Sequence, residues 1–235
     1  MPVSPVVFLF RDESVVVVDK PAGLVCHRTE LAPDRDVVMT RVRDAIGAYV
    51  YPVHRLDRGT SGALVFALSS AMAARLRVAF DEGRVAKTYV ALARGHAPER
   101  VTVDYAIPKA EDSPVRVAAI TDLERAGAGD HCSLVVARPR TGRYHQIRRH
   151  LAHLRHPLAL DSRYGTGWFN RDIRARSGLA RLALHAYELA FPHPARGDDA
   201  PPLRVRAPVA ADLRAALGAL DLGEALAAFE ARDAP

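Results

Sequence analysis

The stretch "YPVHRLDRGTSGALVF" at residues 51–66 places one carboxylate, Asp57, between the two cations Arg55 and Arg58. Two glycines follow, and residues 62–68 then form an apolar run that is typical of a buried strand. Because glycine permits a tight turn, the pattern predicts that Asp57 is presented at the end of this strand. The neighbouring guanidiniums favour the charged form of this carboxylate. An ionised carboxylate is a candidate nucleophile, and an ordinary surface ion pair is the alternative.

The sequence around this stretch predicts further strands and helices. Residues 6–23 show two apolar runs around a polar turn, which predicts two short strands. Apolar residues recur at helical spacing over residues 38–49. The serines at 69–70 can cap a following helix, and Gly83 can close it. Residues 87–95 then predict a strand.

The second half of the chain continues in the same way. We expect strands at residues 101–108, 115–123, 131–139, 181–191 and 203–209, and helices at 144–154 and 210–233, the last broken near 221–223. Residues 126–129 are predicted to form a loop, and residues 168–177 to be polar and irregular. Many strands interrupted by a few helices predict an α+β fold with a large mixed, mostly antiparallel sheet flanked by helices.

The composition is that of an ordinary globular protein with a basic surface. Apolar residues make up 49% and charged residues 26%, and 33 Lys and Arg against 27 Asp and Glu give a formal charge of +6. This balance favours an anionic partner, of which nucleic acid is the first candidate. Cys26 and Cys132 form no CxxC motif, so neither a disulfide framework nor a zinc knuckle is expected. We expect a cytoplasmic protein, without a signal peptide or a membrane span.

Several stretches in order resemble known motifs. "HRLDRGTSGALVFAL" at residues 54–68 resembles the catalytic motif of the RluA-type pseudouridine synthases. Four further stretches resemble other motifs of that family: "VVVVDKPAGLVCHR" (15–28), "KTYVALARG" (87–95), "RTGRYHQIRRHLAHLRHPLALDSRYG" (140–165) and "RLALHAYELAF" (181–191). The resemblance covers roughly residues 6–208. It implies a single pseudouridine synthase catalytic domain over residues 1–235, with a helical tail at 210–235 and no N-terminal S4-like module.

The resemblance also implies a reaction, a partner and a subgroup. These enzymes cut the C1′–N1 bond of a uridine in RNA, turn the base and rejoin it through C5, with no cofactor and no metal. The double arginine Arg148-Arg149 and the Leu-Arg-His-Pro at 154–157 resemble a subgroup that acts on tRNA at a target of the uridine-65 type. The chain is shorter than that subgroup between residues 110 and 131. A ribosomal RNA synthase and a non-catalytic RNA-binding or RNA-folding protein are the alternatives.

The resemblance assigns roles to individual residues. Asp57 is the nucleophile, which attacks C1′ or C6 or assists a glycal route. Tyr89 stacks on the uracil and takes part in proton transfer at C5, and Arg148 pairs with Asp57. Leu184 supplies an apolar wall for the base. For Tyr89, Arg148 and Leu184 the alternatives are a core tyrosine, a solvated helix residue and a core leucine.

Basic residues near these positions are candidates for RNA contact. Arg55 is expected to fill the space that an extruded uridine vacates. Arg58, Arg143 and Arg149 are expected to contact phosphates, and a solvated basic face is the alternative. Among the histidines, the set at residues 145, 150, 153 and 156 has no acidic or cysteine ligand beside it, so a metal site is not expected. The Gly-Thr-Ser-Gly run lacks the pattern of a serine hydrolase elbow. We expect a monomer that binds RNA and no membrane.

Overall fold

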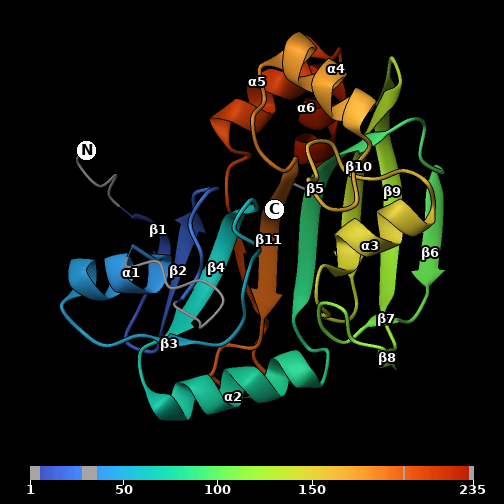
Figure 1. The fold of residues 1–235 in the computed structure, drawn as a ribbon. Helices are drawn as coiled ribbons and strands as arrows, with labels where there is room; N and C mark the ends of the chain where they lie inside the picture. Colours follow the sequence, from blue (N-terminus) through green and yellow to red (C-terminus); the bar gives the residue numbers. More distant parts are fainter. Residues whose placement is uncertain (1–5, 28–35, 198, 233–235) are drawn as a thin grey trace. The chain divides into compact units, whose positions relative to one another are not determined.

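The computed structural model describes residues 6–27, 36–197 and 199–232, and the chain divides into two compact units (Figure 1). Unit 1 comprises Met1–Lys87 and Ala186–Pro208, and unit 2 comprises Thr88–His185 and Val209–Pro235. No helix within the described ranges is long and apolar enough to cross a membrane.

Unit 1 contains a sheet in the order β1 (Val7–Arg11), β2 (Val15–Lys20), β4 (Ser61–Ala67) and β11 (Leu184–Phe191). The short strand β3 (Tyr51–Pro52) pairs with β4, and β12 (Leu203–Arg206) pairs with β11. The ladders β1–β2, β2–β4, β3–β4 and β11–β12 are antiparallel. The polar turn expected between the first two strands is confirmed, because Asp12 Oδ1 accepts hydrogen bonds from the backbone N–H groups of Ser14 and Val15 at 2.8 and 2.9 Å.

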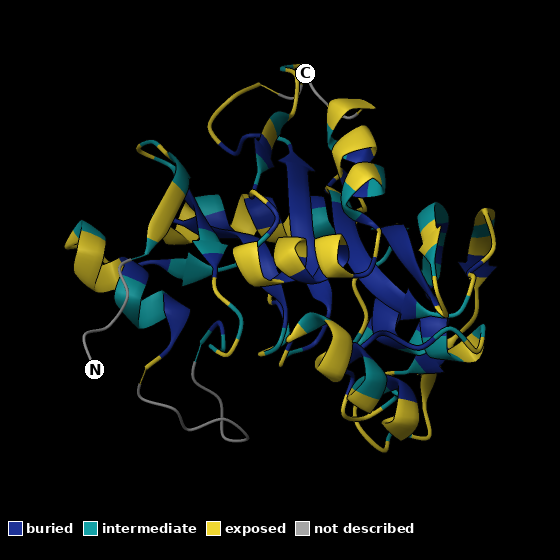
Figure 2. Cartoon of the chain, turned by 90° about the horizontal axis from the view of Figure 1, so that it is seen from above, coloured by how far each residue is buried: buried dark blue, intermediate teal, exposed yellow. Residues whose placement is uncertain are grey.

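The core of unit 1 lies between this sheet and α2 (Ser70–Asp81), which packs its buried alanines and Leu76 against the strands (Figures 1 and 2). Ser69 caps α2 as expected, because its side chain accepts a hydrogen bond from Met72 N at 3.2 Å. A second helix, α1 (Val38–Ile46), ends at Gly47, whose φ of 69° suits a residue without a Cβ.

Unit 2 contains a sheet in the order β5 (Ala86–Arg94), β10 (Cys132–Pro139), β9 (Ile120–Gly129) and β6 (Arg100–Asp104). Its β10–β5, β10–β9 and β6–β9 ladders are antiparallel, and β7 (Ile107–Pro108) and β8 (Arg116–Val117) form a separate hairpin. The helices of this unit are α3 (Gln146–His153), α4 (Gly167–Ser177), α5 (Ala211–Ala219) and α6 (Gly223–Arg232). The α+β class is therefore confirmed.

The break expected in the C-terminal helix is confirmed. The chain turns between α5 and α6 at Asp221, whose φ is 58°. The last residues of the predicted helix, from 233 onward, lie outside the described part of the chain.

The prediction of a loop at residues 126–129 is wrong, because β9 continues through Gly129 and pairs with β10. The glycines are there because α6 and the turn before it lie close to the strand. A Cβ added at Gly127 would lie 2.4 Å from the Cβ of Ala225, and one at Gly129 would lie 2.7 Å from the backbone oxygen of Leu220. Glycine in a strand marks this kind of close approach as well as a turn.

The prediction of an irregular segment at residues 168–177 is also wrong, because these residues belong to α4. The helix buries only Phe169 and Ile173, which are four residues apart and share one face. Gly178 ends it with a φ of 70°. Most of the remaining positions are polar and the apolar Trp168 is exposed, so the amphipathic signal over this segment is weak.

Candidate active site

Asp57 lies in the loop of residues 53–60 between β3 and β4, which we call the aspartate loop. Its side chain is half-buried, whereas Arg55 and Arg58 are exposed. The loop turns sharply after Asp57, because Thr60 N donates a hydrogen bond to the backbone oxygen of Asp57 at 3.0 Å. The expected tight turn between Asp57 and β4 is therefore confirmed, and the presentation of the carboxylate to a substrate stays a prediction.

A buried lysine connects the aspartate loop to the Lys-Pro-x-Gly turn after β2. Lys20 is fully buried, and its Nζ donates to the backbone oxygens of Pro21 at 2.8 Å and Leu24 at 2.7 Å. It also donates to the backbone oxygen of Arg58 at 3.3 Å, and Gly23 N donates to the same oxygen at 2.7 Å. A buried ammonium requires such partners. The two turns are therefore held together by one cation.

Cys26 makes a second connection to the aspartate loop. Its Sγ accepts a hydrogen bond from Leu56 N at 3.1 Å and donates to the backbone oxygen of Leu56 at 3.3 Å. Burial raises the pKa of the Cys26 thiol, so it is neutral at neutral pH. Cys26 therefore acts as a backbone partner inside unit 1.

His54 makes a third connection, from the aspartate loop to β4. Val65 N donates to His54 Nε2 at 3.1 Å, and the imidazole stacks on Phe80 with ring centroids 4.8 Å apart. Burial and, to a lesser extent, the positive charge of Lys87 lower the pKa of His54 to about 3. The imidazole is therefore neutral at neutral pH, with its proton on Nδ1 because Nε2 is an acceptor.

Gly62 lies at the start of β4, and any other residue at this position would require the backbone to move. Its φ is 112°, and an added Cβ would lie 2.2 Å from the backbone oxygen of Ala186 in β11. The glycine therefore allows the first residues of β4 to lie directly against β11. This close approach fixes the point where the aspartate loop joins the sheet.

In unit 2, Tyr89 and Leu184 both lie on strands. Tyr89 lies in β5, is 9% exposed and faces Ala137 of β10 in the ladder. Leu184 is the first residue of β11 and is buried. Its backbone oxygen accepts a hydrogen bond from Arg181 Nη1 at 3.2 Å. Both residues are therefore buried on strands.

Arg148 lies on α3 and is 8% exposed. Its Nε donates to Asp161 Oδ2 at 2.8 Å, and its Nη2 donates to Asp161 Oδ1 at 2.9 Å. Asp161 lies in the "LDSRYG" run at residues 160–165, and the sequence predicts no role for its carboxylate. No periodicity connects residues 148 and 161, so only the fold reveals this pair. The pairing of Arg148 with Asp57 stays a prediction.

Two arginine side chains lie close to the aromatic ring of Tyr164. The Cζ atoms of Arg148 and Arg149 lie 5.2 and 5.4 Å from its centroid, which is within range of a cation–π interaction. His145 Nδ1 lies 3.2 Å from the Tyr164 hydroxyl. Arg143 is exposed in the preceding loop. The start of α3 therefore carries basic and aromatic side chains close together.

Two further histidines of the cluster, His150 and His156, contact polar groups within unit 2. His150 Nδ1 lies 2.9 Å from Thr121 Oγ1, and its Nε2 lies 3.0 Å from the backbone oxygen of Tyr105. Burial lowers the pKa of His150. His156 Nδ1 lies 2.8 Å from the backbone oxygen of Arg94. These contacts hold α3 and the turn after it onto the sheet.

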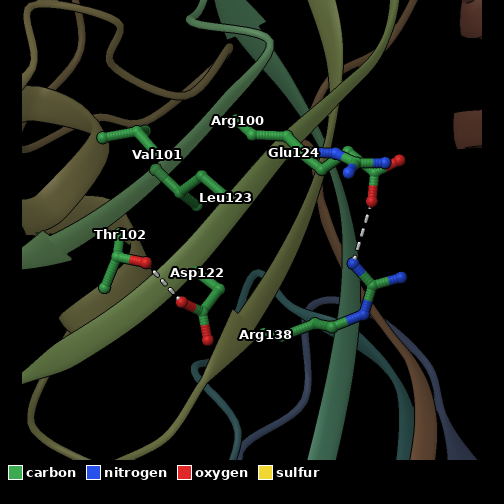
Figure 3. Close-up of a pocket in the computed structure, with 7 residues that line it drawn as sticks. All are labelled: Arg100, Val101, Thr102, Asp122, Leu123, Glu124 and Arg138. Carbon is green, nitrogen blue, oxygen red and sulfur yellow. Dashed lines mark hydrogen bonds and ion pairs between the residues drawn. The ribbon is translucent and has the colours of Figure 1, made fainter.

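A pocket in unit 2 lies on the β6–β9–β10 face and holds none of the predicted site residues (Figure 3). Dashed lines in Figure 3 join Thr102 to Asp122 and Arg138 to Glu124. Thr102 Oγ1 donates to Asp122 Oδ1 at 2.7 Å, and Arg138 Nη1 donates to Glu124 Oε2 at 3.1 Å. Both carboxylates of this pocket therefore already have hydrogen-bond partners.

Comparison with known proteins identifies the class. The family model described as RNA pseudouridylate synthase matches residues 14–153, which include the aspartate loop, β5 and α3. The chain therefore belongs to the RNA pseudouridylate synthases, the isomerases that convert uridine to pseudouridine in RNA, and the resemblance found in the sequence is confirmed.

Two bacterial relatives within this family are similar to the chain over most of its length. The chain is 41% identical over 211 residues to a Yersinia pestis protein named tRNA pseudouridine synthase C, covering 81% of this chain and 82% of that protein. It is 40% identical over 208 residues to the Vibrio cholerae protein of the same name, covering 79% and 85%.

Two human structures are similar in fold. RNA Pseudouridylate Synthase Domain Containing 1 has a TM-score of 0.70 and 30% identity, covering 88% of this chain and 86% of that one. RNA Pseudouridylate Synthase Domain Containing 4 has a TM-score of 0.76 at 24% identity, covering 92% and 93%. The second likeness concerns the fold alone.

Proposed function

We propose that this protein isomerises one specific uridine of tRNA to pseudouridine. The observation that carries this proposal is the 41% identity to a tRNA pseudouridine synthase C over 81% of this chain and 82% of the relative. The basic composition supports an RNA partner, because Lys and Arg exceed Asp and Glu by 33 to 27. The relatives give no comparable support to a ribosomal RNA target.

In the proposed reaction Asp57 opens the glycosidic bond. The routes through C1′, through C6 or through a glycal all begin with an ionised carboxylate. Tyr89 stacks on the uracil and takes part in proton transfer at C5, and Leu184 forms an apolar wall beside the base. Arg148 pairs with the carboxylate of Asp57 and orients it. The connections through Lys20, Cys26 and His54 favour this role for Asp57, since a nucleophile must be held in one geometry.

We also propose that arginines position the RNA. A uridine inside folded RNA is stacked, so the enzyme must extrude the base before reaction. Arg55 is exposed two residues before Asp57, which suits a side chain that fills the vacated space. Arg58, Arg143 and Arg149 contact phosphates, whose contribution to affinity is independent of sequence.

The protein is further proposed to act in the cytoplasm as a monomer and without a cofactor. Its cysteines, Cys26 and Cys132, are both buried and are not joined to each other by a disulfide, which is compatible with a reducing compartment. Size-exclusion chromatography with light scattering tests the monomer directly, and a mass near twice 25.6 kDa would contradict it.

Pseudouridine mapping of total RNA from a deletion strain tests the proposed function. We expect loss of pseudouridine at one tRNA position, with uridine 65 the first to examine. A plasmid carrying the wild-type gene should restore it, and one carrying Asp57→Asn should not. Loss at a ribosomal RNA position instead would replace the tRNA assignment. An unchanged map across all RNA would favour the non-catalytic RNA-binding alternative.

A further inference from the structure

Asp161 is one of the most completely buried charged side chains in the described part of unit 2. Its carboxylate is 0% exposed and accepts both hydrogen bonds from Arg148. It also accepts hydrogen bonds from the backbone N–H groups of Arg163 at 2.9 Å and Tyr164 at 3.0 Å. Four donors therefore surround two oxygens, which is close to the capacity of a carboxylate.

These donors determine the charge of the pair. Burial by itself would raise the pKa of Asp161, but the hydrogen bonds from Arg148 and from the backbone of Tyr164 and Arg163 lower it overall. Asp161 is therefore ionised at neutral pH. A bidentate carboxylate also fixes the plane of a guanidinium, which a single hydrogen bond does not. Because Nε and Nη2 are bonded to Asp161, the Nη1 edge of Arg148 is turned away from it.

The turn that carries Asp161 also carries the ring that contacts Arg148. Tyr164 donates its backbone N–H to Asp161, and its ring centroid lies 5.2 Å from the Cζ of Arg148. Residues 161–164 therefore restrain the guanidinium of Arg148 in two ways. The carboxylate of Asp161 fixes its plane, and the ring of Tyr164 lies against it.

Asn170 of α4 holds this turn in place. Its Nδ2 donates to the backbone oxygen of Asp161 at 3.1 Å, and its Oδ1 accepts from Leu160 N at 2.8 Å. Leu160 has a φ of 58°, which costs energy in a residue with a branched side chain and requires support. Gly165 lies so close that an added Cβ would be 2.2 Å from the oxygen of Asp161. Asn170 therefore connects α4 to the backbone that presents the carboxylate.

We propose that Asp161, with its turn held by Asn170, is a positioning residue that orients Arg148 for the isomerisation. The inference rests on the proposed function of Arg148. Stability alone gives a weak reason for the pair, because a buried ion pair often stabilises a fold no more than apolar residues of the same size. Orientation of a functional guanidinium requires this arrangement, because small displacements at a reacting group cost large factors in rate.

The first test is Asp161→Asn, which keeps the shape but replaces one accepting oxygen with an NH₂ group. We expect the single-turnover rate on a tRNA transcript to fall by about tenfold or more, with KM within about threefold of wild type. Asn170→Ala should give a smaller loss of the same kind. Asp122→Asn is the matched control, because Asp122 holds Arg140 in a bidentate pair at 2.7 Å that the proposed reaction does not use. A wild-type rate for Asp161→Asn in the active enzyme would overturn the inference.

A double-mutant cycle separates positioning from a general effect on the fold. In an Arg148→Ala background, Asp161→Asn should change the rate by less than about twofold, because the side chain through which it acts is gone. An independent loss of about tenfold in that background would overturn the inference. A merely structural Asp161 would produce that second result.

Solvent exchange of the Arg148 Nε proton, followed by NMR, gives a readout that needs no activity. The proton should exchange slowly in wild type and about tenfold or more faster in Asp161→Asn, because its acceptor has been changed. Equal exchange in both proteins would overturn the positioning role. If the wild-type protein isomerised no uridine, the proposed function would fail whatever this exchange showed. If wild type is active and Asp161→Asn is equally active, only the positioning inference fails.

Discussion

The buried Nζ of Lys20 lies 3.3 Å from the backbone oxygen of Arg58, the residue that follows Asp57. Lysine is among the residues least often buried completely, and a buried ammonium is retained only where acceptors surround it. Here the acceptors are backbone oxygens of two turns that are far apart in the sequence. The cation therefore acts as a cross-link between β2 and the aspartate loop.

Replacing Lys20 with methionine should destabilise unit 1 and impair the enzyme together. The apolar side chain leaves the carbonyl groups of Pro21, Leu24 and Arg58 without this donor, which costs about 1–3 kcal/mol for a buried group. Urea unfolding measures the free energy of unfolding, and the rate on tRNA is measured on the same preparation. An unchanged stability and an unchanged rate would show that the cross-link is dispensable.

Asp57→Asn should abolish uridine isomerisation while it leaves affinity for tRNA within about tenfold of wild type, because phosphate contacts supply most of the affinity. Filter binding and a pseudouridine assay on the same transcript separate the two properties. Full activity in this variant would remove Asp57 from the nucleophile role.

The affinity for tRNA should decrease steeply with salt, because bound phosphates release counterions. Replacing Arg143 with alanine should reduce the slope of log K against log salt concentration by about one unit. Arg214→Ala is the control, since Arg214 pairs with Glu230 in the C-terminal helices. An equal slope in the wild-type and Arg143→Ala proteins would show that Arg143 contacts no phosphate.

The lowered pKa of His54 predicts that the folded protein loses stability in acid. The pKa of His54 is about 3 in the folded protein and 6.5 ordinarily. Between these two pH values the imidazole is therefore protonated in the unfolded chain and neutral in the folded one. Its contribution to the free energy of unfolding is complete above pH 6.5 and decreases as the pH falls toward 3, because the unfolded chain gains a proton over this range.

Urea unfolding at about pH 7 and about pH 5 checks this contribution. His54→Gln keeps an acceptor for Val65 N but does not titrate, so its stability should fall less between the two pH values than that of wild type. His150 also has a lowered pKa and contributes to both proteins, so the difference between them isolates His54. Equal losses in the two proteins would contradict the assignment.

Two glycines should respond to alanine in opposite directions. Gly62→Ala places a Cβ 2.2 Å from the backbone oxygen of Ala186 at a φ of 112°, so it should destabilise the protein by more than about 2 kcal/mol. Gly218 lies exposed in α5 with no atom within 4 Å of an added Cβ. Gly218→Ala should therefore stabilise by about 0.5–1 kcal/mol. Thermal unfolding of both variants measures the two signs, and a destabilised Gly218→Ala would contradict the reasoning.

Much of the fold follows from local patterns in the chain. The valine run of β2 predicts a buried strand, Ser69 predicts the start of α2, and the turn at Asp221 separates two amphipathic helices. The motif around Asp57 predicts the family. These signals are short in range, because hydrophobic periodicity, caps and turns act between residues within a few positions of one another.

Only the tertiary structure determined those features that depend on contacts between segments distant in the sequence. Residues 127 and 129 belong to β9 because that strand pairs with β10, and they are glycines because α6 and the turn before it leave no room for a Cβ. The helix α4 forms around only two buried side chains. The bidentate pair of Arg148 with Asp161 joins a helix to a turn after it, and no spacing rule predicts it. A chain specifies such pairs only through its complete fold, because the partners meet only after the elements between them have packed.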